Sequence, residues 1–364
     1  MAASQPAPAP ALELAVWEYA GLMLTYWCNA KCAFCYVYSG PDRGGRMEVA
    51  EALDYWHGLR EVAAAGGKSM RVHLSGGEPF GDWPHLLAVA EAAHRDGLTG
   101  GGGFEKVETN AYWARDDGET RDRLAALRGC GMSMLIISAD VYHQEFVPFD
   151  RVERCVRVAR DVLGEKNVRV RWWDFVAAPV DLRGADEPTR RKAFADALVR
   201  HRERLTGRAA DELCGHFPGQ PPESFESDIC AKPVLESRHV HIDPYGNVFP
   251  GVCSGIILGN ARRESIPAMW RRLRDDWRSH PVVEPVVRGS ATALYREAVR
   301  LGYSARPEGY ANKCHLCTHV RQYLHERGDW SDTVGPADCY ARREERGAAT
   351  PFVGISVSAD ARRA

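Results

Sequence analysis

The sequence contains no apolar run long enough to cross a bilayer. Its N-terminus, MAASQPAPAPALELA, lacks a basic segment followed by an apolar one, so we expect no signal peptide but a flexible tail over residues 1–15. A formal net charge of −2 argues against a nucleic-acid carrier, because phosphate binding needs a clearly basic face. We therefore expect a globular protein that binds neither a membrane nor nucleic acid.

Cysteine, in contrast, is abundant, with 11 in 364 residues. Without a secretion signal, this number favours metal or redox chemistry over disulfides and predicts a reducing, cytoplasmic location. Three cysteines lie in one short stretch, six follow residue 210, and Cys130 and Cys155 stand alone and are expected in the core. This uneven distribution predicts two metal-binding regions.

The first region is the stretch TYWCNAKCAFCYVY from Thr25 to Tyr38, which contains Cys28, Cys32 and Cys35. Spacings of three and two residues force the three sulfurs to converge from one loop. Thiolates are the usual ligands of iron–sulfur clusters, which normally take four of them. Zinc sites also require four ligands, usually from paired motifs, and no fourth ligand is nearby. The loop therefore predicts a cluster with one iron left for another ligand.

This spacing, with Phe34 before the last cysteine, resembles the cluster loop of the radical S-adenosylmethionine (AdoMet) enzymes. In that family AdoMet chelates the open iron of a 4Fe-4S cluster, and one electron cleaves the sulfonium to give a 5′-deoxyadenosyl radical. The resemblance implies that Cys28, Cys32 and Cys35 hold the cluster and that Phe34 lies at the cofactor. It also implies a reducing partner such as flavodoxin or ferredoxin.

Short apolar runs alternate with helical segments from residue 20 to about residue 206. This pattern predicts crossover units and a parallel sheet of the α/β class. We count five or six units, too few for a closed eight-fold barrel, and the family resemblance implies a partial (β/α)6 TIM-like barrel over residues 16–206. The strands are expected at Ala20–Thr25, Met70–Leu74, Phe104–Glu108, Met132–Ser138 and Val168–Val176.

The second strand is followed by Ser75-Gly76-Gly77-Glu78-Pro79. The glycines let a backbone approach a ligand closely, and the proline fixes the turn after them. The resembling family uses such an element at the methionyl amino group of AdoMet, which implies this role for Gly76, Gly77 and Glu78. The alternative is a tight strand-to-helix turn.

Polar residues also end the later strands. Asn110 follows the third strand and is expected at the ribose or carboxylate of AdoMet, or as a cap of the strand end. Ser138 ends the fourth strand, where similar proteins place a polar residue near the ribose. Arg171 on the fifth strand suits a bidentate contact with the AdoMet carboxylate. Arg169 lies on the same face, so the two arginines cannot be separated by this argument.

The second metal-binding region follows a linker expected at residues 207–228. Residues 229–340 are expected to form a second domain, with a hairpin at His239–Val252, before a tail over residues 341–364. This domain resembles the SPASM and twitch extensions that hold auxiliary clusters, and its cysteine number favours the shorter twitch form. The resemblance implies one auxiliary 4Fe-4S cluster, with a four-cysteine zinc site as the alternative. The implied ligands are Cys230, Cys253, Cys314 and Cys317.

Four further side chains are candidates for chemistry on the substrate. Asp140 and His143 follow the fourth strand and are candidate catalytic residues, although a single histidine near a loop is more often structural. Cys214 and Cys339 lie outside the four-ligand set. Either thiol is a candidate hydrogen-atom donor, a further ligand or a buried structural residue, and Cys214 is the better placed donor.

Together these features imply a radical AdoMet enzyme that abstracts a hydrogen atom from a peptide or a small-molecule natural product. The outcome would be oxidation, cross-linking or epimerisation. The alternative is an iron–sulfur electron-transfer or scaffold protein without radical chemistry. Such a protein has no need of the SGGEP element or of a barrel.

Overall fold

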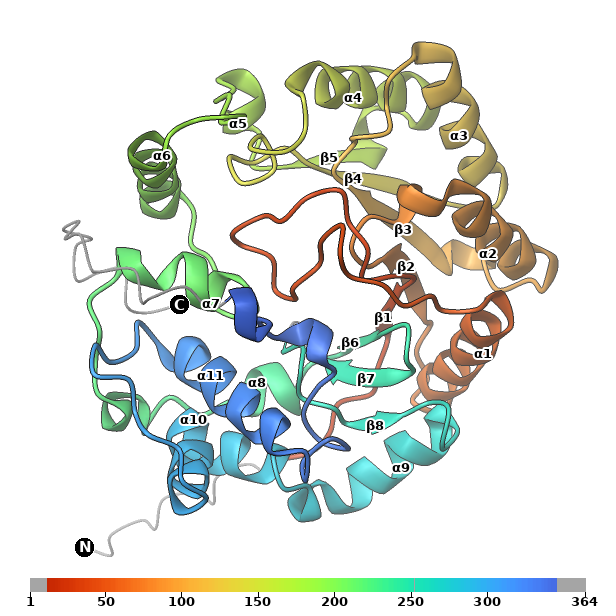
Figure 1. Ribbon diagram of the computed structural model, residues 1–364. Coiled ribbons are helices and arrows are strands. Elements are labelled where there is room, and N and C mark those ends of the chain that lie inside the picture. Colours follow the sequence, from red (N-terminus) through yellow and green to blue (C-terminus); the bar gives the residue numbers. More distant parts are fainter. Residues whose placement is uncertain (1–11, 252, 346–364) are drawn as a thin grey trace, which may run out of the picture.

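The computed structural model describes residues 12–251 and 253–345. Their eight strands form one sheet in the order β5–β4–β3–β2–β1–β6–β7–β8 (Figure 1). In Figure 1 the sheet curves through the molecule, with the loop that follows β1 on its inner side. The strands are β1 (Tyr19–Met23), β2 (Arg71–Ser75), β3 (Phe104–Thr109), β4 (Met134–Ser138), β5 (Val168–Arg171), β6 (His239–Ile242), β7 (Asn247–Pro250) and β8 (Gly259–Asn260).

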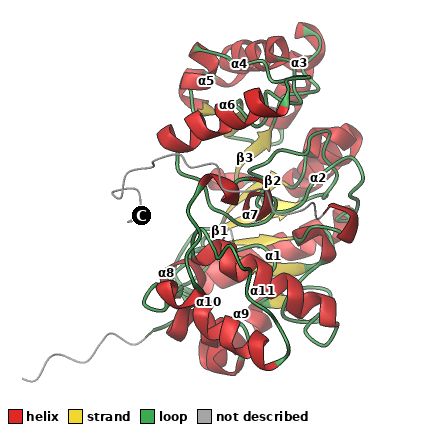
Figure 2. Cartoon of the chain, turned by 60° about the vertical axis from the view of Figure 1, so that its left-hand side comes forward, coloured by secondary structure: helices red, strands yellow, loops and turns green. Residues whose placement is uncertain are grey.

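Strands β1 to β5 are parallel neighbours, and each is joined to the next through at least one helix. Leu22 and Leu74 lie in register on one face of the sheet and are fully buried against the helices in the main core. Helices flank the strands along the whole length of the molecule (Figure 2). This arrangement confirms the predicted α/β fold of the partial-barrel type. The helices of this part are α1 (Val49–Ala65), α2 (Trp83–Arg95), α3 (Asp117–Gly129), α4 (Phe149–Leu163), α5 (Asp174–Ala177) and α6 (Glu187–Arg200).

The sixth parallel strand is found at an unexpected position. In the described residues no strand lies between β5 and β6, and β6 pairs in parallel with β1 instead of extending the sheet beyond β5. The predicted hairpin is present as antiparallel β6 and β7, but it belongs to the same sheet as the barrel strands. The sheet is therefore continuous across the segment expected to be a linker.

The fifth strand is shorter than predicted. It was expected over Val168–Val176 but ends at Arg171, where Trp172 adopts a φ of +56°. This left-handed backbone breaks the strand, and α5 follows with Phe175 buried. The early end leaves the Arg171 side chain at the rim of the barrel.

The C-terminal part adds helices that lie beside the sheet extension in Figure 1. The part of the chain that the structure describes contains no helix long and apolar enough to span a membrane. The helices after α6 are α7 (Ala209–Glu212), α8 (Ala231–Val234), α9 (Ile266–Asp276), α10 (Val283–Arg300) and α11 (Lys313–Arg327).

The end of the predicted N-terminal tail is packed against these helices. Leu14 is buried, and the indole N–H groups of Trp270 and Trp277 donate to the carbonyls of Ala15 (3.1 Å) and Leu12 (3.3 Å). Residues 12–15 are thus part of the fold, which corrects that part of the expected flexible tail. The rest of that tail, residues 1–11, and residues 346–364 of the predicted C-terminal tail lie outside the described residues.

Candidate active site

A cavity of about 440 Å³ lies where the cysteine loop meets the C-terminal ends of β2 to β5. The structure brings together here side chains that are far apart in the sequence. Glu78 and Asp140 are buried and are not among the residues that line the cavity. The predicted site residues that do line it are Cys28, Cys32, Phe34, Cys35, Gly76, Gly77, Asn110, Ser138, His143, Arg169 and Arg171.

The three loop cysteines face this cavity from a compact turn. The Cys35 N–H donates to the Cys32 carbonyl (3.1 Å), and the Ala30 N–H donates to the Cys28 sulfur (3.4 Å). Burial raises the pKa of Cys28 and Cys32 well above that of a free thiol. Thiols of this kind ionise when a metal replaces the proton, so the loop has the chemistry of a cluster-binding site.

A segment expected to be a barrel-to-linker boundary holds this loop in place. The buried guanidinium of Arg208 donates to the carbonyls of Cys32 (3.2 Å) and Ser39 (2.7 Å), and the Arg208 N–H donates to the Cys35 carbonyl (2.8 Å). Gly207 has a φ of +59°, and a Cβ there would lie 2.3 Å from the Tyr36 carbonyl carbon. Sequence reasoning missed both residues, because a Gly-Arg pair in an irregular segment carries no recognisable signal.

The glycines of the SGGEP element allow close contact with the chain that leads into the cysteine loop. A Cβ on Gly76 would lie 2.4 Å from the Thr25 carbonyl oxygen, and one on Gly77 would lie 2.0 Å from that of Trp27. The Gly77 N–H donates to the Thr25 carbonyl (2.8 Å) and the Glu78 N–H to that of Trp27 (2.9 Å). The turn therefore positions the start of the loop as well as lining the cavity.

Glu78 acts inside the protein and not on the cavity surface. Its carboxylate accepts hydrogen bonds from the Asn110 N–H (2.7 Å), the Thr109 hydroxyl (2.9 Å) and the Phe80 N–H (3.2 Å). Burial raises the pKa of Glu78 to about 7, although these hydrogen bonds oppose the rise. In this structure Glu78 thus joins the SGGEP turn to the end of β3.

Asn110 links the end of β3 to the cysteine loop. Its amide nitrogen lies 3.7 Å from the Cys28 sulfur and donates to the Asn29 side-chain oxygen (2.9 Å). Its own side-chain oxygen accepts from the Tyr112 N–H (3.0 Å). The Asn110 amide therefore contacts Cys28, a predicted cluster ligand, and also lines the cavity.

At the end of β5, two acidic side chains lie beside Arg171. Its guanidinium forms an ion pair with Glu203, lies 3.7 Å from Asp140 and stacks 4.1 Å over the Phe34 ring. Burial raises the pKa of Glu203 to about 8, partly opposed by Arg171. Sequence reasoning missed Glu203, which lies in the irregular chain after α6.

His143 reaches the cavity with Asp140 behind it. The Asp140 carboxylate accepts from the His143 ring nitrogen Nδ1 (2.8 Å). Burial would raise the pKa of Asp140, but His143 and then Arg171 hold it below its ordinary value. An ionised aspartate that orients a histidine at a cavity wall is a common arrangement in proton transfer.

The residues present fit a polar cofactor bound beside a cluster. The side-chain hydroxyls of Ser39 and Ser75 are buried, line the cavity and have no hydrogen-bond partner among the described residues. Buried polar groups are normally paired, so a ligand with polar atoms would satisfy them. The two arginines that also line the cavity favour a ligand carrying a carboxylate.

The second set of predicted ligands comes from three places in the C-terminal part. Cys230 precedes α8, Cys253 follows β7, and Cys314 and Cys317 lie near the start of α11. Burial raises the pKa of Cys230, and Cys317, Cys253 and Cys314 add to the rise. Burial, Cys253 and Cys317 likewise raise the pKa of Cys314 to about 12. The four thiols therefore lie close enough to influence one another's ionisation.

The environment of this second set contains positive charge. Burial raises the pKa of Cys253, whereas Arg204, Arg321 and Lys313 lower it. Cations around cysteine ligands stabilise the thiolates that both zinc and iron–sulfur clusters need.

The two remaining C-terminal cysteines do not line the cavity. Burial raises the pKa of Cys214 to about 11, and its sulfur lies 3.5 Å from the Asp211 carbonyl oxygen. Cys339 is fully buried, with its sulfur 3.7 Å from the Tyr26 hydroxyl.

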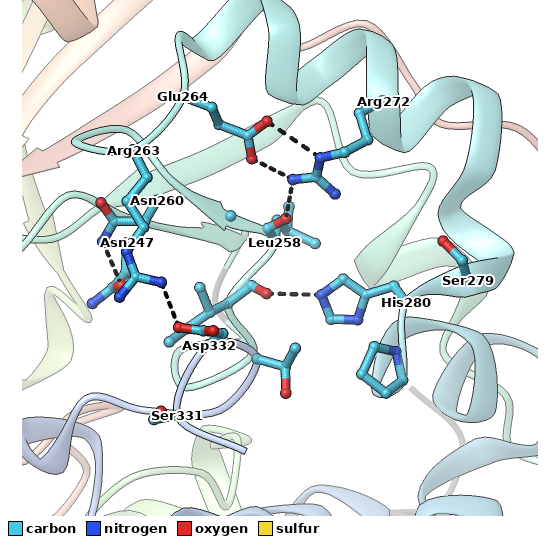
Figure 3. A pocket seen from close by; sticks show the side chains of 14 residues that line it. Asn247, Leu258, Asn260, Arg263, Glu264, Arg272, Ser279, His280, Ser331 and Asp332 are labelled. Carbon is cyan, nitrogen blue, oxygen red and sulfur yellow. Dashed lines mark hydrogen bonds and ion pairs between the residues drawn. The ribbon is translucent and has the colours of Figure 1, made fainter. Parts of the chain in front are cut away.

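A second cavity of about 330 Å³ lies beside β7, β8 and α9 (Figure 3). Its charged groups are already paired, since Arg272 binds Glu264 and Arg263 binds Asp332. The His280 ring contacts the Ile257 carbonyl (2.8 Å). Its lining contains none of the predicted site residues.

Comparison with known proteins finds a family model similar to the part of the chain that contains the cysteine loop. Residues 22–168 match the family model of the radical SAM superfamily. The proteins of that superfamily use a 4Fe-4S cluster and AdoMet. The search of curated proteins finds no match.

Two similar solved structures are both of a protein called anSMEcpe. One is described as "Native anSMEcpe with bound AdoMet and Cp18Cys peptide", and the other is a hexahistidine-tagged anSMEcpe with bound AdoMet. The first is 12% identical with a TM-score of 0.39, and the similarity covers 85% of this chain and 97% of that one. The second is 11% identical with a TM-score of 0.37, covering 85% and 93%.

Proposed function

We propose that this protein reductively cleaves AdoMet and uses the resulting radical to abstract a hydrogen atom from a peptide or small-molecule substrate. The observation that carries the proposal is one cavity lined by all three loop cysteines, both glycines of the SGGEP turn and the ends of β3, β4 and β5. An electron-transfer or scaffold protein needs the thiols but has no use for a cavity of this size beside them.

Each group on the cavity wall has a role in this proposal. Cys28, Cys32 and Cys35 hold the cluster, which supplies the electron that cleaves AdoMet. Gly76 and Gly77 leave room for the methionyl group, while Arg171 or Arg169 binds its carboxylate.

The ribose and the substrate are assigned to other residues that line the same cavity. Asn110 and Ser138 provide polar groups for the ribose, and Phe34 covers the guanidinium of Arg171. His143, oriented by Asp140, is the candidate for moving a proton to or from the substrate. A substrate packed against these side chains would exclude water, which protects a reactive radical.

We also assign an auxiliary 4Fe-4S cluster to Cys230, Cys253, Cys314 and Cys317. Two observations support this assignment. The other three thiols raise the pKa of Cys230, as close neighbours would, and cations lie near Cys253. Such a cluster would accept the electron that an oxidative outcome releases. A zinc ion at the same four cysteines is the alternative.

The experiment is anaerobic reconstitution with iron and sulfide, reduction with dithionite in the presence of AdoMet, and assay of 5′-deoxyadenosine. We expect product from the wild type and none from the Cys28→Ala/Cys32→Ala/Cys35→Ala variant. The same variant should retain about four irons and sulfide at the C-terminal site, as one cubane cluster requires. Cleavage by the variant would contradict the radical proposal, and zinc in place of iron would contradict only the auxiliary cluster.

A matched control is the Cys130→Ala variant. Cys130 is a buried cysteine of the barrel core that lies away from the cavity. The Cys130→Ala variant should form 5′-deoxyadenosine at the wild-type rate. This control distinguishes the loss of a cluster ligand from the loss of any buried thiol.

A further inference from the structure

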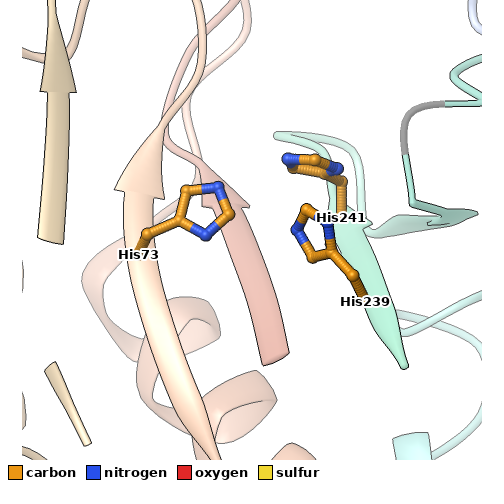
Figure 4. A group of neighbouring side chains, drawn as sticks. All are labelled: His73, His239 and His241. Carbon is orange, nitrogen blue, oxygen red and sulfur yellow. The ribbon is translucent and has the colours of Figure 1, made fainter. Parts of the chain in front are cut away.

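Three histidines meet on the inner face of the sheet, one from β2 and two from β6. The ring centroids of His239 and His241 lie 4.4 Å apart, and that of His73 lies 5.3 Å and 5.2 Å from them. Figure 4 shows the His73 ring directed toward the other two across the strand that separates β2 from β6. One ring nitrogen from each histidine lies within 4.8 Å of the others.

The register of the sheet explains how the three side chains meet. Gly21 on β1 pairs with His73 on one side and with His241 on the other. A Cβ on Gly21 would lie 2.3 Å from the His241 ring and 2.6 Å from that of His73. The glycine therefore leaves the space between the two rings open. His239, two residues before His241, points to the same face.

The hydrogen bonds of the rings leave nitrogen lone pairs available. His241 Nδ1 lies 2.6 Å from the Gly251 carbonyl oxygen, which can only accept, so a neutral ring carries its proton there and its lone pair on Nε2. Donation of the second nitrogen to a carbonyl is the usual outer contact of a metal-binding histidine. His239 Nε2 and His73 Nδ1 are buried without a hydrogen-bond partner among the described residues.

The group lies next to the candidate active site. Glu108 lines the large cavity, and its carboxylate oxygen lies 3.9 Å from His73 Nε2 and 2.8 Å from the Lys106 ammonium. Tyr36 also lines the cavity, with its ring 5.8 Å from that of His241. A ligand held by the three histidines would therefore lie next to the cavity that the loop cysteines line.

We propose that His73, His239 and His241 bind one divalent transition-metal ion, with zinc as the best-suited metal. Imidazole nitrogens are typical ligands of zinc, and three of them leave a fourth position for water or an oxygen ligand. Zinc–nitrogen bonds of about 2.0 Å place the nitrogens of a tetrahedral site about 3.4 Å apart. The ring nitrogens here lie within 4.8 Å of one another, so small side-chain rotations would bring them to that distance. Glu108 offers a carboxylate oxygen 3.9 Å from His73 Nε2 as the fourth ligand, and a substrate oxygen that enters from the cavity could take the same position.

The alternative is a cluster of aromatic rings without a metal, because the Tyr19 ring stacks on His73 at 4.9 Å and lies tilted against His239 at 4.5 Å. Metal analysis separates the two. The whole protein is reconstituted with iron and sulfide to fill its cysteine sites, exposed to zinc chloride and desalted. We expect wild type to hold one zinc per chain more than the His239→Gln and Gly21→Ala variants.

The matched control is His85→Gln. His85 is also buried, and its Nε2 contacts the Met47 carbonyl (2.9 Å) outside the histidine group. It should bind as much zinc as wild type. The zinc X-ray absorption spectrum of wild type should show a nitrogen and oxygen shell with imidazole scattering, a readout that needs no variant to fold. Equal zinc contents in wild type and His239→Gln, or a first shell of sulfur, would overturn the proposal.

Discussion

At the scale of single residues, the buried carboxylate of Glu78 shows how the site depends on groups that do not reach the cavity. It accepts three hydrogen bonds from the end of β3 and the turn after β2. A glutamine has one acceptor oxygen and one donor amide, so it cannot accept from the Asn110 N–H in the same geometry.

We expect Glu78→Gln to lower the free energy of unfolding by about 1–3 kcal/mol, the typical cost of an unsatisfied buried group. The pKa of Glu78 is raised from 4.5 to about 7, so the folded state holds this proton more tightly than the unfolded state. The protonated carboxyl of Glu78 therefore adds to the free energy of unfolding at low pH, and this addition is lost as the pH rises through about 7.

The cost of Glu78→Gln should therefore be larger near pH 5.5 than near pH 8, by about 2 kcal/mol. Urea unfolding of wild type and variant at the two pH values measures this difference. A cost that does not change with pH would show that the carboxyl keeps its ordinary pKa.

Asn110 gives a second prediction at this scale. Its amide nitrogen lies 3.7 Å from the Cys28 sulfur. Hydrogen bonds to cluster sulfurs raise the reduction potential, because they stabilise the added negative charge. Asn110→Ala should lower the potential of the loop cluster in the absence of AdoMet, as measured by redox titration. An unchanged potential with weaker AdoMet binding would instead assign Asn110 to AdoMet alone.

At the scale of elements, the SGGEP turn and the cysteine loop form one packed unit. A methyl group at position 77 would lie 2.0 Å from the Trp27 carbonyl oxygen, which no small adjustment of a flexible side chain can relieve. The backbone itself must move, and it carries Cys28 one residue later.

Gly77→Ala should therefore lose the iron of the loop cluster and at least ten-fold of the AdoMet cleavage rate. Gly44→Ala is the matched control, because a Cβ at Gly44 has no atom within 4 Å. Iron analysis and the 5′-deoxyadenosine assay test both variants. Equal activity of the two would mean that the turn and the loop are not coupled.

The same scale shows what could be predicted from sequence. The α/β alternation, the strand-end position of Asn110, the place of Arg171 on the fifth strand and the spacing of the cysteines follow from local pattern. The structure brings these residues to one cavity, with Arg171 at the end of β5 and not within it. The pairing of β6 with β1 was not predicted, because register between distant strands has no local signal. The roles of Arg208 and Glu203 were also missed. Both residues lie in irregular chain, where no local pattern indicates which distant groups a side chain contacts.

At the scale of the whole molecule, the C-terminal part encloses the cysteine loop instead of standing apart from it. The Tyr38 N–H donates to the Asp338 carbonyl (2.9 Å), and the Ser254 hydroxyl donates to the Tyr36 carbonyl (2.5 Å). Arg208 completes the enclosure from the segment after α6. The loop is therefore fixed from two sides by chain that is distant in sequence.

Arg208→Met should remove this support and leave the buried Ser39 carbonyl without a donor, while the Cys32 carbonyl keeps only the Cys35 N–H. We expect a cost of about 1–3 kcal/mol of unfolding free energy. The variant should also make the loop cluster lose iron faster in air. Arg238→Met is the control, because that side chain is 64% exposed and pairs only with Glu18 among the interactions described. Similar stability and iron loss in the two variants would show that Arg208 does not hold the loop.

The most direct test of the central claim is electron paramagnetic resonance of the reduced loop cluster alone. The Cys230→Ala/Cys253→Ala/Cys314→Ala/Cys317→Ala variant removes the second set of ligands and leaves Cys28, Cys32 and Cys35. The account predicts a reduced 4Fe-4S signal whose g-values shift when AdoMet is added, because AdoMet occupies the iron that lacks a cysteine. A cluster signal that AdoMet leaves unchanged would contradict it.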